Sequence, residues 1–237
     1  MKAAVITFPG SNCDRDAFTA LDAMLSGQWG SQTGDVVKVW HQDTELPKVD
    51  LVMLPGGFSY GDYLRSGAMS ARSPIMDAVK KHADAGRYVV GVCNGFQILT
   101  ESGLLPGALM RNRELKFICK TVHLKVVQRH RVFTKDYDAE QVIALPVAHH
   151  DGNYRIDDSE LKILQDNEQI VFQYCDEQGN VTDDANINGS MNNIAGIINK
   201  KGNILGMMPH PERACDALTH SVSGRGIFTS LYHSVVT

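Results

Sequence analysis

The chain has 237 residues, of which 21% are charged and 43% are hydrophobic, so its composition is that of a folded globular protein and excludes a disordered or fibrous one. Lys and Arg number 23 against 27 Asp and Glu, and this net charge of −4 lacks the basic excess typical of nucleic-acid-binding proteins. No apolar run approaches the roughly 18 residues of a membrane helix, and five cysteines without a Cys-x-x-Cys pair predict no disulfide framework and a reducing, cytoplasmic location.

Predicted strands and helices alternate in the first half of the chain. The predicted strands are short runs of apolar and β-branched residues at Lys2–Phe8, Asp35–Trp40, Leu51–Leu54 and Tyr88–Val92. One helix is expected to run to about Ser26, capped by Asn12 or Asp14. A second is expected over Ser73–Ala85, with Ile75, Met76, Val79 and Ala83 facing inward. Strands that are apolar on both faces indicate a parallel sheet covered on both sides.

The second half of the chain has a different pattern. Its predicted strands are Phe117–Val127, Gln141–Ala148, Gln169–Tyr174 and Ile194–Met208, the last interrupted by a hairpin turn at 199–203, and a helix follows near Gly226–Val235. No linker or repeat separates the halves. The prediction is an α/β fold in a single domain over residues 1–237. It has a flavodoxin-like, mainly parallel sheet flanked by helices, with an added antiparallel region in the second half.

The sequence Gly91-Val92-Cys93-Asn94-Gly95 joins a buried strand to a helix-like stretch. Glycines two residues before and after the centre are the layout of a nucleophile elbow, because larger side chains would collide in so tight a turn. The helix N-terminus favours the reactive thiolate. Cys93 is therefore the candidate nucleophile, and the alternative is a small buried apolar residue, as most free cysteines are. Structural roles are the favoured interpretation for the other cysteines, Cys13, Cys119, Cys175 and Cys215.

A thiol nucleophile requires a base and a group that orients the base. His210 lies in Pro209-His210-Pro211-Glu212, directly after an apolar run. The prolines are expected to hold this segment extended, with His210 and Glu212 on one face. Glu212 would then accept a hydrogen bond from one ring nitrogen and leave the other to Cys93. The alternative is a turn with a solvated His and Glu.

His149 and His150 are rival candidates for the base. Asp151 follows them, but adjacent residues on a strand point apart, so neither histidine is expected to be oriented by it. A metal site built from the three residues has no characteristic spacing, and we expect no bound metal.

The glycines of Leu54-Pro55-Gly56-Gly57-Phe58 follow another core strand. Without Cβ atoms, Gly56 and Gly57 can turn a backbone N–H toward a ligand, and together with the N–H of Asn94 this would form an oxyanion hole. The alternative is a plain turn at the end of a strand. A phosphate-binding loop is disfavoured, because no Gly-x-Gly-x-x-Gly follows the first strand and no Gly-Lys-Ser/Thr occurs.

Pro-Gly-Gly, Gly-x-Cys-x-Gly-x-Gln and Pro-His-Pro-Glu occur in this order, and together they resemble class I, triad-type, glutamine amidotransferases. Further matches extend the resemblance over essentially the whole chain, toward members of the family that serve purine biosynthesis. These matches lie at residues 9–14, 56–67, 93–107, 188–190, 194–197 and 206–213.

The resemblance implies a reaction in which Cys93 attacks the side-chain amide of L-glutamine. His210 acts as base and then as acid to the leaving ammonia, Glu212 orients His210, and the glutamyl thioester is hydrolysed to glutamate. Gln97 matches the residue that helps hold glutamine, so the implied substrate-binding residues are Gly56, Gly57, Asn94 and Gln97.

The resemblance also implies that the chemistry is divided between two chains. Ammonia passes to a large synthetase subunit, which uses ATP and magnesium to aminate formylglycinamide ribonucleotide, with or without a third, small subunit. No cofactor, nucleic-acid partner or membrane partner is expected for this chain itself.

Three segments depart from the family pattern. Residues 148–152 read Ala-His-His-Asp-Gly where Ala-His-Gly-Glu-Gly is expected, and residues 185–189 read Ala-Asn-Ile-Asn-Gly where Asn-Pro-Asn-Gly is expected. Gly27–Gly34 resembles a slight insertion between the first predicted helix and the second predicted strand. The candidate triad is intact, but any role around His150 stays open. The alternatives are another cysteine hydrolase of this fold, such as a γ-glutamyl hydrolase or a peptidase, and a non-catalytic binding module. The intact Cys, His and Glu and the run Phe58-Ser59-Tyr60-Gly61-Asp62 favour the amidotransferase.

Overall fold

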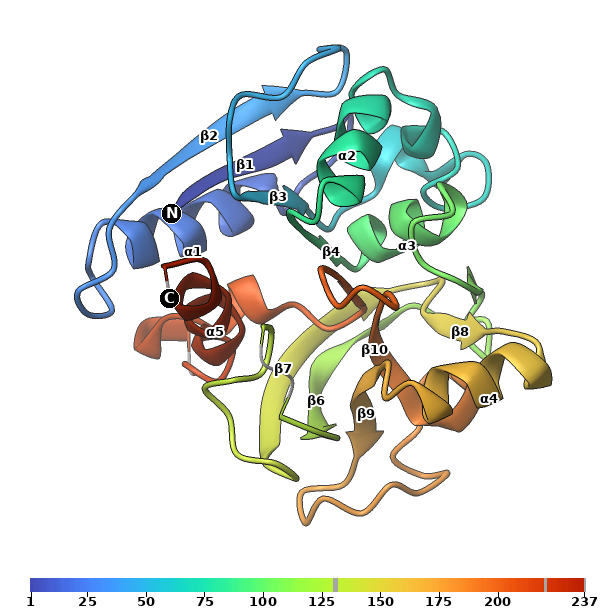
Figure 1. Cartoon of the computed structure of the whole chain (residues 1–237). Coiled ribbons are helices and arrows are strands. Elements are labelled where there is room, and N and C mark those ends of the chain that lie inside the picture. Colours follow the sequence, from blue (N-terminus) through green and yellow to red (C-terminus); the bar gives the residue numbers. More distant parts are fainter. Residues whose placement is uncertain (130–131, 220, 237) are drawn as a thin grey trace.

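The computed structural model describes residues 1–129, 132–219 and 221–236 (Figure 1). Within these ranges, one nine-stranded sheet has the strand order β2-β1-β3-β4-β11-β10-β9-β6-β7. Its parallel half consists of β1 (Lys2–Thr7), β2 (Asp35–Trp40), β3 (Leu51–Leu54), β4 (Tyr88–Val92) and β11 (Ile204–Met207). Its antiparallel half consists of β10 (Ile194–Ile198), β9 (Ile170–Cys175), β6 (Ile118–Val126) and β7 (Val142–His149). The predicted α/β fold, with a parallel sheet core and an antiparallel region from the second half of the chain, is therefore confirmed.

Helices flank the sheet on both sides of its parallel half (Figure 1). Helix α1 packs against α5, while α2 and α3 lie across β3 and β4 from them. The helices are α1 (Asp14–Leu25), α2 (Ile75–Asp84), α3 (Asn94–Glu101), α4 (Asp158–Asp166) and α5 (Arg225–Val236). In the part of the chain that the structure describes, no helix has the length and apolar character needed to cross a membrane.

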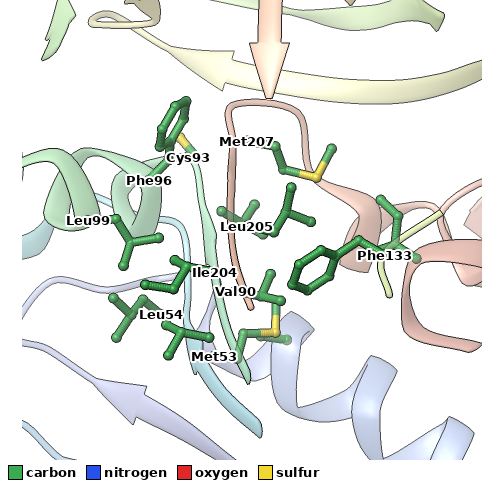
Figure 2. Packing of buried hydrophobic residues seen from close by; sticks show 14 of the residues in the cluster. Met53, Leu54, Val90, Cys93, Phe96, Leu99, Phe133, Ile204, Leu205 and Met207 are labelled. Atoms are coloured by element: carbon green, nitrogen blue, oxygen red, sulfur yellow. The ribbon is translucent and has the colours of Figure 1, made fainter. Parts of the chain in front are cut away.

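The core is built on both faces of the parallel strands. Figure 2 shows Phe96 and Leu99 of α3 on one side of β4 and β11, and Phe133, from the connection between β6 and β7, on the other. All three side chains are fully buried. Because both faces of β4 are buried, apolar and polar residues do not alternate along it, and its sequence is an almost unbroken apolar run.

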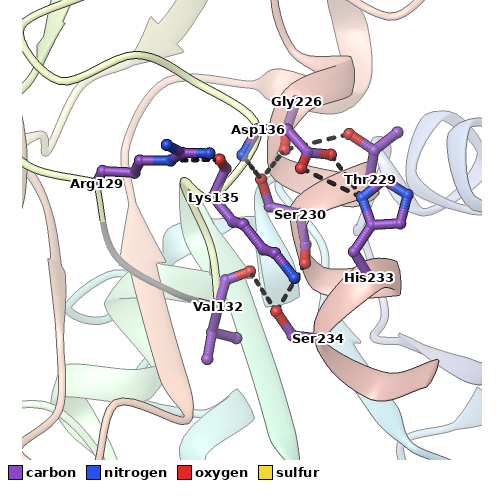
Figure 3. A network of polar contacts seen from close by, with 9 residues as sticks. All are labelled: Arg129, Val132, Lys135, Asp136, Gly226, Thr229, Ser230, His233 and Ser234. Carbon is purple, nitrogen blue, oxygen red and sulfur yellow. Dashed lines mark hydrogen bonds and ion pairs between the residues drawn. The ribbon is translucent and has the colours of Figure 1, made fainter. Parts of the chain in front are cut away.

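A polar network holds the connection between β6 and β7 against α5 (Figure 3). The backbone N–H of Asp136 donates to Ser230 Oγ at 2.8 Å, and His233 Nδ1 lies 2.9 Å from the Asp136 carboxylate. Ser234 Oγ donates to the carbonyl oxygen of Val132 at 3.4 Å. These contacts fasten the segment that carries Phe133, and so they help to close the core over β4.

The predicted cap of the first helix is wrong. Cys13 is the N-cap of α1 and makes no side-chain capping bond, while its carbonyl oxygen accepts the Ala17 N–H at 3.0 Å. Asp14 does not cap because it lies in the first turn, where its carboxylate contacts Lys38 at 3.1 Å. Helix α4 was not predicted, and neither were the strands β5 (Ala108–Met110) and β8 (Asn153–Arg155), which pair with each other. Three-residue strands are too short to show a period.

The parallel half of the sheet determines where functional loops can gather. The carboxyl ends of parallel strands lie at one edge, and here β1, β3, β4 and β11 are neighbours in the strand order. The segments that follow them carry Cys13, Gly56, Cys93 and His210. Crevices at this edge are where open α/β sheets bind ligands.

Candidate active site

Only Cys93 separates the last residue of β4 from the first residue of α3. Its backbone has φ 50° and ψ −106°, the strained positive-φ conformation that agrees with the predicted nucleophile elbow. A Cβ added to Gly91 would lie 2.6 Å from the carbonyl oxygen of Gly95, and one added to Gly95 would lie 2.0 Å from that of Leu54. Glycine is therefore required at both positions. The turn presents the Cys93 side chain, which is 4% exposed, at the N-terminus of α3.

His210 reaches the same place from the neighbouring strand, because β11 pairs with β4 in parallel. Its backbone N–H donates to the carbonyl oxygen of Pro146 on β7 at 2.8 Å, which fixes the chain where it leaves the sheet. A Cβ added to Gly56 would lie 2.6 Å from His210 Cε1 and 3.4 Å from Cys93 Cβ. The imidazole and the Cys93 side chain therefore both lie directly against Gly56.

Glu212 completes the arrangement with a short hydrogen bond. Its Oε1 lies 2.6 Å from His210 Nδ1, and both side chains are buried. The expectation of an extended segment holds for His210, at φ −100° and ψ 91°, but is wrong for Pro211–Arg213, which form a 3₁₀ helix. The fixed φ of proline suits the first helical position as well as a strand. The helical turn brings the Glu212 carboxylate back to the His210 ring. The predicted hydrogen bond therefore forms, but from a 3₁₀ turn instead of an extended segment.

Neighbouring charges set the protonation of His210. Burial alone would lower the pKa of the imidazole, but Glu212 and the Cys93 sulfur outweigh it and hold that pKa well above the usual 6.5. Nδ1 is engaged by Glu212, whereas Nε2 is buried without a hydrogen-bond partner among the described residues. Nε2 is therefore the nitrogen that can accept a proton and return it.

Cys13 lies beside this pair. Its Sγ, a ring nitrogen of His210 and a carboxylate oxygen of Glu212 all lie within 4.8 Å of one another. Sequence reasoning assigned Cys13 a structural role, and the missed signal was its place just after β1, whose end lies at the same sheet edge. Zn²⁺ accepts these three donor types. However, the 2.6 Å bond occupies one donor atom each of His210 and Glu212, which favours proton exchange over metal binding.

Cys215 contrasts with Cys13. Its Sγ donates to the carbonyl oxygen of Pro211 at 3.0 Å, and burial raises the pKa of its thiol. A buried thiol held in its neutral form is unreactive, which agrees with the structural role expected for it.

The other expected substrate-binding residues surround Cys93. Gly57 has φ 134°, a conformation that favours glycine, and the helix N-terminus leaves the N–H of Asn94 free of an intrahelical partner. Asn94 Nδ2 donates to Gln97 Oε1 at 2.9 Å, and Gln97 Nε2 donates to the carbonyl oxygen of Asp151 at 2.7 Å. Gln97 is thus held one turn from Cys93 and linked to the segment that follows β7.

The rival histidines are placed differently from His210. His149 is buried, and its Nδ1 lies 3.1 Å from Asn112 Oδ1. Burial, assisted by the charge of His210, lowers the pKa of His149 to about 4, so this ring stays neutral at pH 7. His150 is partly exposed, and its Nδ1 is 4.0 Å from the Asp151 carboxylate. Neither ring has the short carboxylate contact that His210 has.

Two acidic side chains, Asp62 and Asp151, interact with each other, and the backbone of Asp151 is the acceptor for Gln97. Asp62 Oδ1 and Asp151 Oδ1 are both buried without hydrogen-bond partners in the described ranges, while Ser66 Oγ donates to Asp151 Oδ2 at 2.8 Å. Burial raises the pKa of Asp62 to about 6, and the charge of Asp151 adds to the shift. The folded chain therefore holds the Asp62 proton to a higher pH than the unfolded chain does.

Replacing Asp62 with asparagine is expected to stabilise the protein at pH 8 but not at pH 4. The pKa of Asp62 is about 6 in the folded chain against a reference value of 3.8. As pH rises between these values, the carboxyl ionises more readily in the unfolded chain, so the free energy of unfolding of the wild type falls. Asparagine does not ionise and avoids this loss. Because the carboxyl keeps part of its hydration, we expect a gain of about 1 kcal/mol. Asparagine also tolerates the φ of 51°. Urea unfolding at both pH values measures the effect, and an equal difference at pH 4 and pH 8 would contradict it.

Comparison with known proteins places the chain among glutamine amidotransferases. Residues 1–231 match the family model described as the CobB/CobQ-like glutamine amidotransferase domain. A protein named phosphoribosylformylglycinamidine synthase subunit PurQ, from Synechocystis, is 55% identical over 226 residues, which cover 95% of this chain and 98% of the relative. One of the same name from Rhodopseudomonas palustris (strain HaA2) is 52% identical over 238 residues, covering 100% and 99%.

A solved structure supports the same relationship. A chain in the structure of PurLQS from Thermotoga maritima superposes with a TM-score of 0.84 at 41% sequence identity. The match covers 99% of this chain and 98% of that one. The turn at Cys93, the segment with His210 and the glycine loop therefore lie within a fold that is shared along its whole length.

Proposed function

Because the chain belongs to the CobB/CobQ-like glutamine amidotransferase family, we propose that it is the glutaminase subunit of a phosphoribosylformylglycinamidine synthase. It hydrolyses L-glutamine to glutamate and ammonia, and a large synthetase subunit uses the ammonia and ATP to aminate formylglycinamide ribonucleotide in purine biosynthesis. The observation that carries this proposal is the full-length identity of 55% to a subunit of that enzyme. One nine-stranded sheet that includes strands from both halves of the chain supports a single domain. The place of the reaction in purine biosynthesis supports a cytoplasmic location.

In the proposed reaction, Cys93 Sγ attacks the amide carbon of glutamine while Nε2 of His210 holds the thiol proton. The same proton passes to the leaving nitrogen as the C–N bond breaks, which releases ammonia and leaves a γ-glutamyl thioester. Water then attacks the thioester carbon, His210 takes a proton from it, and the thiol is restored as glutamate leaves. The contact of 2.6 Å between Glu212 and Nδ1 supports this division of roles, because it directs Nε2 to the reacting atoms.

The negative charge that develops on the amide oxygen requires hydrogen-bond donors already in position. The backbone N–H of Asn94 and one N–H of the Gly56-Gly57 loop are the proposed donors, and both flank Cys93. In a well-studied protease, loss of one such donor lowers kcat by about 10²–10³. Gln97 is the proposed contact for the rest of glutamine. These steps require no cofactor or metal in this chain, and ATP with magnesium belongs to the synthetase subunit.

An apolar surface beside the glycine loop supports docking of the synthetase subunit. Tyr63 is 90% exposed and Leu64 is 65% exposed, and Phe58 lies against Phe117 with ring centroids 6.1 Å apart. Exposed aromatic residues gathered near a site are typical of interfaces. We therefore assign the docking of the large subunit to this surface, with or without a third, small subunit.

The isolated chain is expected to hydrolyse glutamine at least about tenfold more slowly than the assembled complex. This surface includes Phe58, the residue after Gly57, so docking onto it would keep the easily rotated glycine loop in the orientation that aims its N–H at the oxyanion. Steady-state ammonia release by the chain alone and with the large subunit plus its ligands tests this. Tyr63→Ala should lower the rate of the complex and leave the lone chain unchanged. Ile163→Ala on α4, which replaces a side chain that is 54% exposed, is the matched control and should change neither. A lone chain as fast as the complex would rule out activation by docking.

A further inference from the structure

The segment that follows β1 is joined to the glycine loop that follows β3 by four hydrogen bonds. The backbone N–H of Phe58 donates to the carbonyl oxygen of Gly10 at 3.3 Å, and that of Tyr60 donates to Pro9 at 2.7 Å. The other two bonds converge on the carbonyl oxygen of Gly56. Ser11 Oγ donates to it at 3.1 Å, and the backbone N–H of Cys13 donates to it at 3.3 Å.

These last two bonds set the direction of a peptide plane. The structure has no cis peptide bond in its described ranges, so the carbonyl of Gly56 and the N–H of Gly57 point in opposite directions. Two donors on the carbonyl oxygen therefore turn the Gly57 N–H away from the segment 11–13. This N–H is buried, and it has no hydrogen-bond acceptor among the described residues. A buried donor without an acceptor is rare in folded proteins and points to a ligand.

From this geometry we propose that Ser11 is a positioning residue of the glutaminase site. Its hydroxyl holds the carbonyl of Gly56 and thereby fixes the N–H of Gly57 as an oxyanion donor before glutamine binds. The proposal rests on the function proposed above and goes beyond it, because it assigns the preorganisation of the oxyanion hole to a side chain in the loop after β1. Cys13 serves the same end through its backbone N–H, and its sulfur lies beside His210 and Glu212.

A side-chain contact is needed here because the loop itself is easy to rotate. Gly56 and Gly57 carry no Cβ, and Gly57 has φ 134°, a conformation that is unstrained only for glycine. The backbone bond from Cys13 is long at 3.3 Å, and the shorter bond to the carbonyl comes from Ser11. Removing the hydroxyl therefore leaves the peptide plane held at one point instead of two.

Ser11→Ala is expected to lower kcat for glutamine hydrolysis by the assembled complex about tenfold, with KM changed less than twofold. The loss is smaller than the 10²–10³ or so that follows removal of an oxyanion donor, because the N–H remains and is only less well aimed. Ser11→Thr keeps the hydroxyl and should restore most of the rate. Ser26→Ala, which removes a serine bond of 3.3 Å at the far end of α1, is the matched control and should leave kcat unchanged.

Alkylation separates positioning of the donor from a general disturbance of the site. Iodoacetamide reacts with the Cys93 sulfur by displacing iodide, a step that forms no tetrahedral oxyanion. The alkylation rate, followed by mass spectrometry of the peptide that contains Cys93, should therefore be the same in Ser11→Ala and wild type. Synthesis from added ammonia by the complex should also be unchanged.

Each outcome decides the question. A tenfold lower kcat with unchanged alkylation supports the proposal. Equal losses in glutamine hydrolysis and alkylation would overturn it in favour of a structural role for Ser11, and an unchanged kcat would overturn it outright. A wild-type complex that makes product from ammonia but not from glutamine would instead overturn the proposed function.

Discussion

Cys93→Ala is expected to abolish glutamine-dependent synthesis by the complex while leaving synthesis from added ammonia intact. Cys93 is the proposed nucleophile, and it lies with the imidazole against Gly56. Without the sulfur no thioester forms, so the rate should fall to background, by more than about 10⁴-fold, in line with the loss of a nucleophile in a well-studied protease. Ammonia entering from solution bypasses this step, because the amination takes place on the large subunit.

The measurement is product formation by the purified complex with saturating glutamine and, separately, with an ammonium salt. Cys93→Ser should behave like the alanine variant, since the site is arranged for a thiol. Cys119→Ala is the matched control, because Cys119 is exposed on β6 and the proposed mechanism does not use it. If ammonia-dependent synthesis were lost equally in a complex that still assembles, the proposed division of labour between the chains would be wrong.

Glu212→Gln is expected to lower glutamine-dependent synthesis by about 10²–10⁴-fold with ammonia-dependent synthesis again spared. A neutral amide no longer favours the imidazolium, and burial, which on its own lowers the pKa of His210, then dominates. The ring can also adopt the wrong tautomer, which in a well-studied serine protease costs about 10⁴ in kcat. The stability that this pairing gives the folded wild type is present below the ordinary histidine pKa of 6.5 and is lost as pH rises through the raised pKa of His210.

Titration of labelled His210 by NMR in the isolated chain checks the cause directly. In the wild type the ring should stay protonated well above pH 6.5, and in Glu212→Gln it should lose its proton at a lower pH than in the wild type. Glu160→Gln, at an exposed position on α4, is the control and should alter neither the titration nor the rate. An unchanged His210 titration in Glu212→Gln would show that the carboxylate does not set the charge of the ring.

Local patterns predicted the features whose cause is local. The strand at Tyr88–Val92 was found because its apolar run is continuous, and the turn at Cys93 because glycines flank it at fixed offsets. The hydrogen bond between His210 and Glu212 was also foreseen, although the helical turn that forms it was not. Each of these depends on residues within a few positions of one another.

What sequence reasoning missed depends on contacts between distant segments. Cys13 lies beside His210 because β1 and β11 end at the same sheet edge. The residues around Cys13 show that a strand ends there, but not that β11 ends beside it. The bond from Ser11 to Gly56 likewise spans two loops on neighbouring strands. The spacing of hydrophobic residues indicates which face of a helix or strand is buried, but not which loops from other parts of the chain lie next to each other. Such pairings become visible only when the strand order is known.

The strand order delays the assembly of the site while the chain is being synthesised. β11, which leads to His210, is the last strand to be made, yet it lies between β4 and β10 in the interior of the sheet. Asn203, just before it, donates to the carbonyl oxygens of Ala83 and Arg87, 120 and 116 residues earlier. A nascent chain that has completed β4 therefore carries its thiol beside an open sheet edge before His210 has been synthesised. Contacts closed over so long a loop form slowly. We therefore expect the chain to hydrolyse no glutamine until His210 has been synthesised and β11 has joined the sheet.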